Sequence, residues 1–251
     1  MDISNSTVLI TGGAGGIGFA LAEEFLKKGA KVKICDKNKE TLKRAKELHP
    51  EIDIFECDLA DKASRFKLFD WATSDGTLNF LLNNAGIQRS YYYTDSNLKP
   101  YDAGANEIEI DLASPIHLCE LFIPYLLKKP EAYILNVASS LAVVHTIEFP
   151  VYCACKAGMH AFTRCIREQL KNTGIKVFGA LPPAVESGLN PEGRAVSTPK
   201  EMMPAAEYAA YVTAAVEADR YEIFAPFYFE TLENKTLKEV YEYFQDASNP
   251  R

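Results

Sequence analysis

Residues 7–18 read "TVLITGGAGGIG", a short apolar run that leads directly into a glycine-rich stretch. The glycines fit two spacings, G-x-G-x-x-G at 13, 15 and 18, and T-G-x-x-x-G-x-G from Thr11 to Gly18. Helical periodicity begins at once in residues 17–29. Glycines between a strand and a helix let a pyrophosphate reach the N–H groups at the helix N-terminus, because no Cβ atom blocks the approach. A plain glycine turn is the alternative, and the strand–loop–helix context favours a phosphate-binding loop.

The rest of the chain alternates short apolar runs with longer helical patterns. The predicted strands cover residues 7–11, 31–36, 52–58, 78–86 (a strand that runs into a turn), 132–139, 175–181 and 221–226. The predicted helices cover residues 17–29, 39–48, 62–73, 104–128, 151–172, 205–218 and 229–246. Strand–helix units in this order predict right-handed crossovers and a parallel sheet. We therefore expect an α/β fold over residues 1–251, a single doubly wound domain with helices on both faces of the sheet.

The overall composition excludes several classes of protein. Of the 251 residues, 47% are hydrophobic and 24% are charged, as in ordinary globular domains. The formal net charge of -7 argues against a nucleic-acid or membrane surface, because phosphate binding needs a basic face. The amino terminus lacks a leader pattern and no window approaches 18 apolar residues, so we expect a cytoplasmic protein without a membrane span. The six scattered cysteines predict neither a disulfide framework nor a bound metal.

Acidic residues end the second and third predicted strands. Asp36 follows Gly18 by 18 residues, and a carboxylate there accepts hydrogen bonds from an adenosine ribose and repels a 2′-phosphate. NAD is therefore the expected cofactor, while the basic neighbour Lys37 would tolerate the phosphate of NADP. The plainer role of Asp36 is to cap the following helix. Asp58 ends the third strand, where it can lie beside the adenine edge.

The stretch "VYCACKAG", residues 151–158, places Tyr152 and Lys156 four positions apart, on one face of a predicted helix. A phenol with a pKa near 10 is a poor acid or base at neutral pH, and a nearby ammonium lowers that pKa by favouring the phenolate. Thirteen residues upstream, "NVASS" ends the fifth strand with serines that can bind a substrate carbonyl. Alone, the tyrosine–lysine spacing is typical of any amphipathic helix.

Together these stretches resemble the short-chain dehydrogenase/reductase family. "TGGAGGIG", "NNAG" (83–86), the strand-end serine and "YCACK" follow the family's order and spacing, and the resemblance covers nearly all of the chain. The family implies a Rossmann-like domain and hydride transfer between a nicotinamide and an alcohol or carbonyl group. Tyr152 would be the general acid/base and Lys156 would bind the nicotinamide ribose. The family's spacing selects Ser139 over Ser140 as the serine that orients the substrate.

The resemblance also implies a set of residues that contact the cofactor. Val185 would offer its backbone to the nicotinamide carboxamide, and Ser187 would replace a threonine near the phosphates. Within the family, "NNAGIQ", "SPIHL" and "PVYCACKAG" are most similar to the branch encoded with bacterial D-alanylation genes. The full set is Gly12, Gly15, Gly16, Ile17, Gly18, Asp36, Lys37, Asp58, Leu59, Asn84, Ala85, Gly86, Tyr152, Lys156, Pro182, Val185 and Ser187.

Two residues depart from the family pattern. The fourth catalytic position, usually an asparagine that holds a helical kink through its main-chain carbonyl, falls on Asp111 in "IEIDLASP". An aspartate can keep that backbone role, but its charge can pair with Lys156 and alter the ionisation of Tyr152. Pro183 stands where the family usually has glycine, and its fixed φ would reshape the turn before the substrate loop.

Further features bear on the substrate and on assembly. "RSYYYTDS" (89–96) is expected either to line the mouth of the substrate cleft or to lie in an exposed loop, and residues 186–204 are expected to form a lid. His145 is expected on a surface loop. The apolar surface of helices 104–128 and 152–172 exceeds the need of one sheet face, and in this family such helices pair between subunits. We therefore expect a homodimer or a homotetramer.

Three functions stay open at this point. The first is an NAD-dependent oxidoreductase that acts on a small-molecule alcohol or carbonyl. The second is a nicotinamide-binding sensor or scaffold with little turnover, which the substitution at Asp111 motivates. The third is an NADP-dependent carbonyl reductase, which Lys37 would permit.

Overall fold

The structure is a computed structural model, and it describes residues 2–94, 106–189 and 202–224. The predicted helix at 229–246 lies outside these residues, as do most of the predicted lid and the end of the tyrosine-rich loop. In the described part, no helix is both long and apolar enough to cross a membrane.

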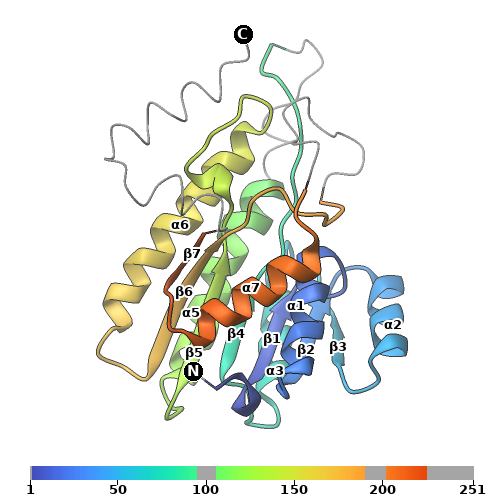
Figure 1. The fold of residues 1–251 in the computed structure, drawn as a ribbon, viewed down its shortest axis with the longest axis vertical. Helices are drawn as coiled ribbons and strands as arrows, with labels where there is room; N and C mark the ends of the chain where they lie inside the picture. Colours follow the sequence, from blue (N-terminus) through green and yellow to red (C-terminus); the bar gives the residue numbers. More distant parts are fainter. Residues whose placement is uncertain (1, 95–105, 190–201, 225–251) are drawn as a thin grey trace.

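A single seven-stranded sheet forms the centre of the protein (Figure 1), and all of its strands are parallel. The strand order is β3-β2-β1-β4-β5-β6-β7. The first three strands are added toward one edge of the sheet and the last four toward the other edge, so the strand order reverses between the neighbours β1 and β4. This confirms the predicted doubly wound sheet. The strands are β1 (Thr7–Thr11), β2 (Lys31–Asp36), β3 (Asp53–Glu56), β4 (Phe80–Asn83), β5 (Ala132–Val137), β6 (Ile175–Leu181) and β7 (Glu222–Phe224).

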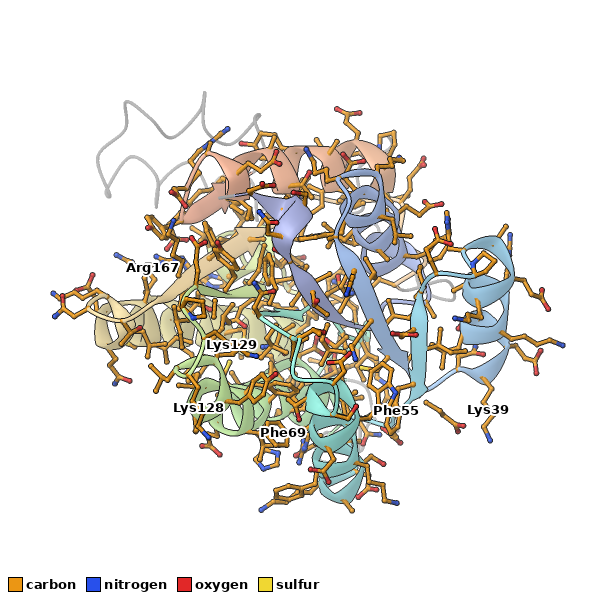
Figure 2. The ribbon with its side chains drawn as sticks, turned by 90° about the horizontal axis from the view of Figure 1, so that it is seen from below. Lys39, Phe55, Phe69, Lys128, Lys129 and Arg167 are labelled. Carbon is orange, nitrogen blue, oxygen red and sulfur yellow. The ribbon has the colours of Figure 1, made fainter. Side chains whose placement is uncertain are left out.

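Helices cover both faces of the sheet, as Figures 1 and 2 show. One face is covered by α1 (Gly16–Lys27), α2 (Lys39–Leu48) and α7 (Ala205–Glu217). The other face is covered by α3 (Lys62–Thr73), α5 (Ser114–Leu126) and α6 (Pro150–Leu170). Short helical turns lie at Ile3–Asn5, Glu109–Ala113 and Ser140–Ala142, the middle one with π-helical hydrogen bonding.

The core consists of two apolar layers, one on each side of the sheet. Phe25 of α1 packs edge-on against Phe80 of β4, with ring centroids 5.3 Å apart. Phe69 of α3, labelled in Figure 2, lies 5.0 Å from Phe122 of α5 between ring centroids. The continuous burial of β1, β4 and β5 follows from this double coverage, because a parallel strand between two helix layers has no solvent-facing side.

Some predicted boundaries are wrong. The strands predicted at 52–58 and 132–139 end at Glu56 and Val137. The stretch 78–86, predicted as a strand that runs into a turn, forms its strand from Phe80 to Asn83. The helix predicted at 104–128 is interrupted by the π-helical turn at Glu109–Ala113. Single π-helical turns inside longer helices are often found at functional sites.

Candidate active site

The main cavity opens where the carboxyl ends of β1, β4 and β5 meet. This is the point at which the strand order reverses, and in open α/β sheets such a point is the usual place for a ligand. The cavity has a volume of about 300 Å³. The predicted cofactor residues that line it are Gly12, Gly15, Gly16, Ile17, Asp36, Lys37, Asp58, Leu59, Asn84, Ala85, Gly86, Tyr152, Lys156, Pro182 and Ser187.

The remaining predicted cofactor residues, Gly18 and Val185, do not line the cavity. Val185 is buried in the core beside α7 and pairs with Met203 in a single β-bridge. Eight lining residues are absent from the sequence-based set: Cys35, Cys57, Ile87, Ile110, Val137, Ala138, Gly188 and Leu189. Four of them, Cys35, Cys57, Val137 and Ala138, lie at or just after strand ends, and only their register in the sheet would have indicated them.

The glycine-rich loop brings the start of α1 to the cavity. Gly15 is the N-cap residue, so the first N–H groups of α1 lie at the cavity wall. A Cβ atom at Gly18 would lie 2.2 Å from the carbonyl oxygen of Gly12, so this glycine lets the helix pack against the strand end. A Cβ atom at Gly15 would meet nothing within 4 Å. The two positions therefore differ: Gly18 serves packing and Gly15 leaves space beside the helix N-terminus.

Asp36 and Lys37 lie at the cavity end nearest β2. Asp36 accepts the N–H of Asn38 through one carboxylate oxygen, at 3.1 Å. The cap of α2 is Asn38, whose Oδ1 accepts the N–H groups of Glu40 and Thr41. The alternative role of Asp36 as the helix cap is therefore wrong. Its carboxylate faces the cavity with Lys37 and Asp58 beside it.

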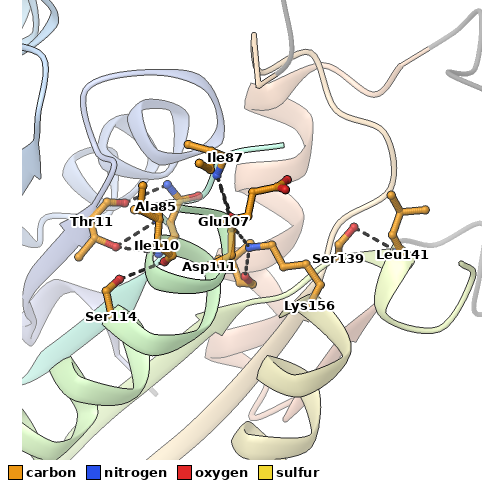
Figure 3. A network of polar contacts seen from close by, with 12 residues as sticks. Thr11, Ala85, Ile87, Glu107, Ile110, Asp111, Ser114, Ser139, Leu141 and Lys156 are labelled. Atoms are coloured by element: carbon orange, nitrogen blue, oxygen red, sulfur yellow. Dashed lines mark hydrogen bonds and ion pairs between the residues drawn. The ribbon is translucent and has the colours of Figure 1, made fainter. Parts of the chain in front are cut away.

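Hydrogen bonds join the end of β1 to the residues that follow β4, under the cavity. The Oγ1 atom of Thr11 accepts the N–H groups of Asn84 and Ala85, at 3.0 and 3.1 Å. In return, the Asn84 side chain donates to the carbonyl of Thr11, at 3.0 Å. Asn83 turns away and donates to Asn136 in the core. Thr11 begins the T-G-x-x-x-G-x-G pattern but is not among the predicted site residues, and the structure shows it as a positioning residue (Figure 3).

The predicted serine, tyrosine and lysine come together beside the cavity. Ser139 follows β5 and accepts the N–H of Leu141, at 3.1 Å. Tyr152 and Lys156 are both buried on α6, and the Lys156 Nζ atom lies 5.3 Å from the Tyr152 ring centroid. Burial raises the pKa of Tyr152 above its usual range, while Lys156 and a hydrogen bond from Ser139 act in the opposite direction. The contact with Tyr152 belongs to Ser139, whereas the Ser140 N–H donates to the carbonyl of Pro182.

Asp111 forms the ion pair with Lys156 that its charge predicts. The Asp111 Oδ1 atom lies 3.1 Å from Lys156 Nζ, and both side chains are buried (Figure 3). Lys156 also donates to the carbonyl of Val137, and Asp111 accepts the N–H of Ile87. Burial disfavours the Lys156 ammonium, but the Asp111 carboxylate and the Tyr152 phenol oxygen together outweigh this effect and raise the pKa of Lys156. Lys156 therefore stays charged beside Tyr152.

The other candidates lie away from the reacting groups. Tyr91 is buried, Tyr92 and Tyr93 are exposed, and none of the three lines the cavity. His145 is exposed, as predicted. Pro183 is half-buried in the irregular segment after β6. Among the described residues, no three His, Cys, Asp or Glu side chains are placed to hold a metal ion.

Comparison with known proteins agrees with this geometry. The family model described as "short chain dehydrogenase" matches residues 6–197. The chain is 42% identical to the oxidoreductase DltE of Bacillus subtilis (strain 168) over 195 residues, which are 77% of each chain. It is 27% identical over 187 residues to the Staphylococcus epidermidis oxidoreductase SERP2049, covering 74% of this chain and 80% of that protein.

Solved structures show the same fold. A short-chain dehydrogenase from Burkholderia cenocepacia J2315 in complex with NADP has a TM-score of 0.84 and 23% identity, with both chains covered fully. A short-chain dehydrogenase/reductase from Burkholderia phymatum in complex with NAD has a TM-score of 0.83 and 20% identity, covering 100% of this chain and 98% of that one. From the family match and the relative at 42% identity, the chain belongs to the short-chain dehydrogenase family and is an oxidoreductase of that family.

Proposed function

We propose that this protein moves a hydride between NAD(H) and the alcohol or carbonyl group of a small molecule, with Tyr152 as the general acid/base. One observation carries the proposal: Ser139, Tyr152 and the charged Lys156 meet beside the cavity that the glycine-rich loop borders. A solvated amphipathic helix would not bury a tyrosine and a lysine side by side against a strand-end serine.

The residues around the cavity fit a dinucleotide. The start of α1 at Gly15 and Gly16 would hold the pyrophosphate, Asp36 the adenosine ribose, and Lys156 the nicotinamide ribose. When bound, the nicotinamide supplies the acceptor or donor of the hydride. The chain's own groups then do the rest: Ser139 and Tyr152 hold the substrate oxygen, and Tyr152 takes up or gives its proton.

The charged Lys156 supports this proton exchange. Its ammonium favours the phenolate of Tyr152, and so offsets part of the effect of burial on the phenol. Asp111 acts in the opposite direction, because its negative charge raises the pKa of Tyr152. We infer that the Lys156–Asp111 pair sets the balance between these two effects.

The choice of NAD over NADP rests on Asp36. Only one of its oxygens accepts a backbone N–H, so the carboxylate keeps acceptors for the two ribose hydroxyls and repels a 2′-phosphate. Lys37 beside it is the feature that favours the alternative, an NADP-dependent carbonyl reductase. Solved neighbours in the family occur in complex with NADP and in complex with NAD, so the fold is compatible with both.

The test of the proposal is a screen of alcohols with NAD and of carbonyls with NADH, run on the wild type and on Tyr152→Phe. We expect Tyr152→Phe to abolish turnover because the phenol alone exchanges the proton, while NADH affinity stays within a few fold. Loss of NADH binding together with turnover would refute this division of roles.

The same screen addresses the second candidate, a nicotinamide-binding sensor with little turnover. The buried Lys156–Asp111 pair is the observation that favours it, because the carboxylate offsets the positive charge that lowers the pKa of Tyr152. Tight NADH binding without turnover in the wild type, together with turnover in Asp111→Asn, would establish the sensor. We also propose a homodimer or homotetramer, which light scattering of the purified protein tests.

A further inference from the structure

Glu107 is a fully buried carboxyl group that the proposed reaction does not use. It lies one helical turn before Asp111, on the segment that leads into the π-helical turn (Figure 3). One of its oxygens, Oε1, accepts the N–H of Arg89 at 2.9 Å. The other, Oε2, is buried and has no hydrogen-bond partner among the described residues. A buried carboxylate with an unpaired oxygen is costly when it is charged.

Glu107 and Asp111 hold the same piece of backbone. Asp111 accepts the N–H of Ile87 and Glu107 accepts the N–H of Arg89, so two carboxylates one turn apart bind alternate residues of the irregular segment after β4. This arrangement holds the two acidic groups near each other. Burial raises the pKa of Glu107 to about 7, and the negative charge of Asp111 adds to that effect.

Several ionisable groups from three segments face Glu107. They are Arg89 and Tyr91 from the adjoining segment, Cys153 and Cys155 from α6, and Asp111 from its own element. Burial raises the pKa of the Tyr91 phenol and of both thiols above their usual ranges, so these three stay neutral. Burial also raises the pKa of Asp111, but its contact with Lys156 opposes that effect. Glu107 is thus the carboxyl of this group whose pKa is raised to about 7 and which, within the described residues, has no cationic side chain hydrogen-bonded to its second oxygen.

We propose that Glu107 is a positioning residue that acts through Asp111 and Lys156, and that the charge on its buried carboxyl sets how readily Tyr152 releases its proton. This inference rests on the proposed role of Tyr152 as the acid/base. An ionised Glu107 adds a second negative charge, beside that of Asp111, near Lys156. This charge raises the pKa of both Lys156 and Tyr152. When Glu107 is neutral, only the Lys156–Asp111 pair acts on Tyr152, and Tyr152 then forms its phenolate at lower pH.

The test compares the pH dependence of kcat/KM for alcohol oxidation in the wild type, Glu107→Gln and Glu109→Gln. Glu107→Gln keeps the shape and the acceptor for Arg89 and removes the charge. Glu109→Gln is the matched control, because Glu109 lies two residues after Glu107, at the start of the π-helical turn, but pairs with Arg65. We expect Glu107→Gln to move the rising limb of the profile down by at least about half a pH unit, as a charge several ångströms away does at an effective dielectric constant of about 20. The control should leave the limb in place.

Two outcomes overturn the inference: an unchanged limb in Glu107→Gln, or equal shifts in both variants, which would report only a disturbed turn. The same comparison can be made without turnover, from the Tyr152 resonance in ¹³C-tyrosine-labelled protein, assigned by its loss in Tyr152→Phe. Inactivity toward every substrate would refute the proposed function, and this resonance would still decide the effect of Glu107. If Glu107→Gln does not fold, ¹³C-glutamate spectra of the wild type decide, and the absence of a carboxyl that titrates near neutral pH overturns the inference.

Discussion

At the scale of single residues, the site depends on charges that are buried in pairs. Asp111 keeps Lys156 charged, and the charges of both residues act on the pKa of Tyr152. Asp36, in contrast, stands at the cavity edge with one oxygen bound to a backbone N–H. A substitution at Asp36 therefore tests the choice of cofactor, and a substitution at Asp111 tests the contribution of the buried ion pair.

Asp36→Ala should remove the discrimination between the two nicotinamide cofactors. We expect the wild type to bind NADH at least about tenfold more tightly than NADPH, a difference of about 1.4 kcal/mol, and the variant to bind both alike. Fluorescence titration with the two cofactors side by side measures this. Tighter binding of NADPH by the wild type would show that Lys37 outweighs Asp36.

Asp111→Ala should destabilise the protein, because it leaves the Lys156 ammonium buried without its carboxylate. Breaking a buried ion pair in this way costs about 3 kcal/mol or more. Asp111→Asn is the control, since its amide oxygen can still accept the Ile87 N–H, and we expect a smaller loss. Urea unfolding of the three proteins gives the free energies. Equal stability of the two variants would contradict the account of the pair.

At the scale of elements, the strand–loop–helix unit of β1 and α1 positions the cofactor end of the cavity. The helix must approach the strand end closely, and its first N–H groups must stay open to the cavity. Gly18 meets the first requirement and Gly15 meets the second, so substitutions at the two glycines can separate them.

Gly18→Ala should reduce stability, whereas Gly15→Ala should reduce cofactor affinity and leave stability nearly unchanged. The added methyl group would lie 2.2 Å from the Gly12 oxygen in the first variant and would meet nothing within 4 Å in the second. In Gly15→Ala, however, it would stand beside the helix N-terminus, where the pyrophosphate is expected. Thermal unfolding and NADH titration of both variants check this. A stable Gly18→Ala with unchanged affinity would refute the packing role.

At the scale of the whole molecule, stability should depend on the protonation of Glu107. The folded protein raises the pKa of this carboxyl to about 7, against an ordinary value of about 4.3 for the unfolded chain. Between these values the folded state binds more protons, so this contribution grows as the pH falls through the window and is lost above pH ~7. Between pH ~8 and ~5 we expect the wild type to gain about 2–3 kcal/mol relative to Glu107→Gln.

The measurement is chemical unfolding of the wild type and of Glu107→Gln at both ends of that window. Because every other titrating group is shared by the two proteins, their difference isolates Glu107. A difference that does not change with pH would mean that the carboxyl titrates normally in the folded state.

Much of the fold was predictable because its signals are local. The glycine spacing, the apolar strands and the helical periodicities each depend on neighbours within one turn or one strand, and the predicted doubly wound parallel sheet is confirmed. The errors occur where a tertiary contact overrides the local pattern. The helix predicted at 104–128 is interrupted at Glu109–Ala113, where Asp111 turns toward Lys156 on another helix.

The sequence by itself determined the family and the α/β class and predicted Ser139, Tyr152 and Lys156 as the catalytic set, because residue type and spacing carry that information. Only the tertiary structure decided which groups are buried together and what charge they keep. The environment of Glu107 is set by Arg89 and by α6, and the cap of α2 by the competition between Asp36 and Asn38. Burial and pairing depend on residues that are distant in the chain, and a linear pattern does not specify those distances.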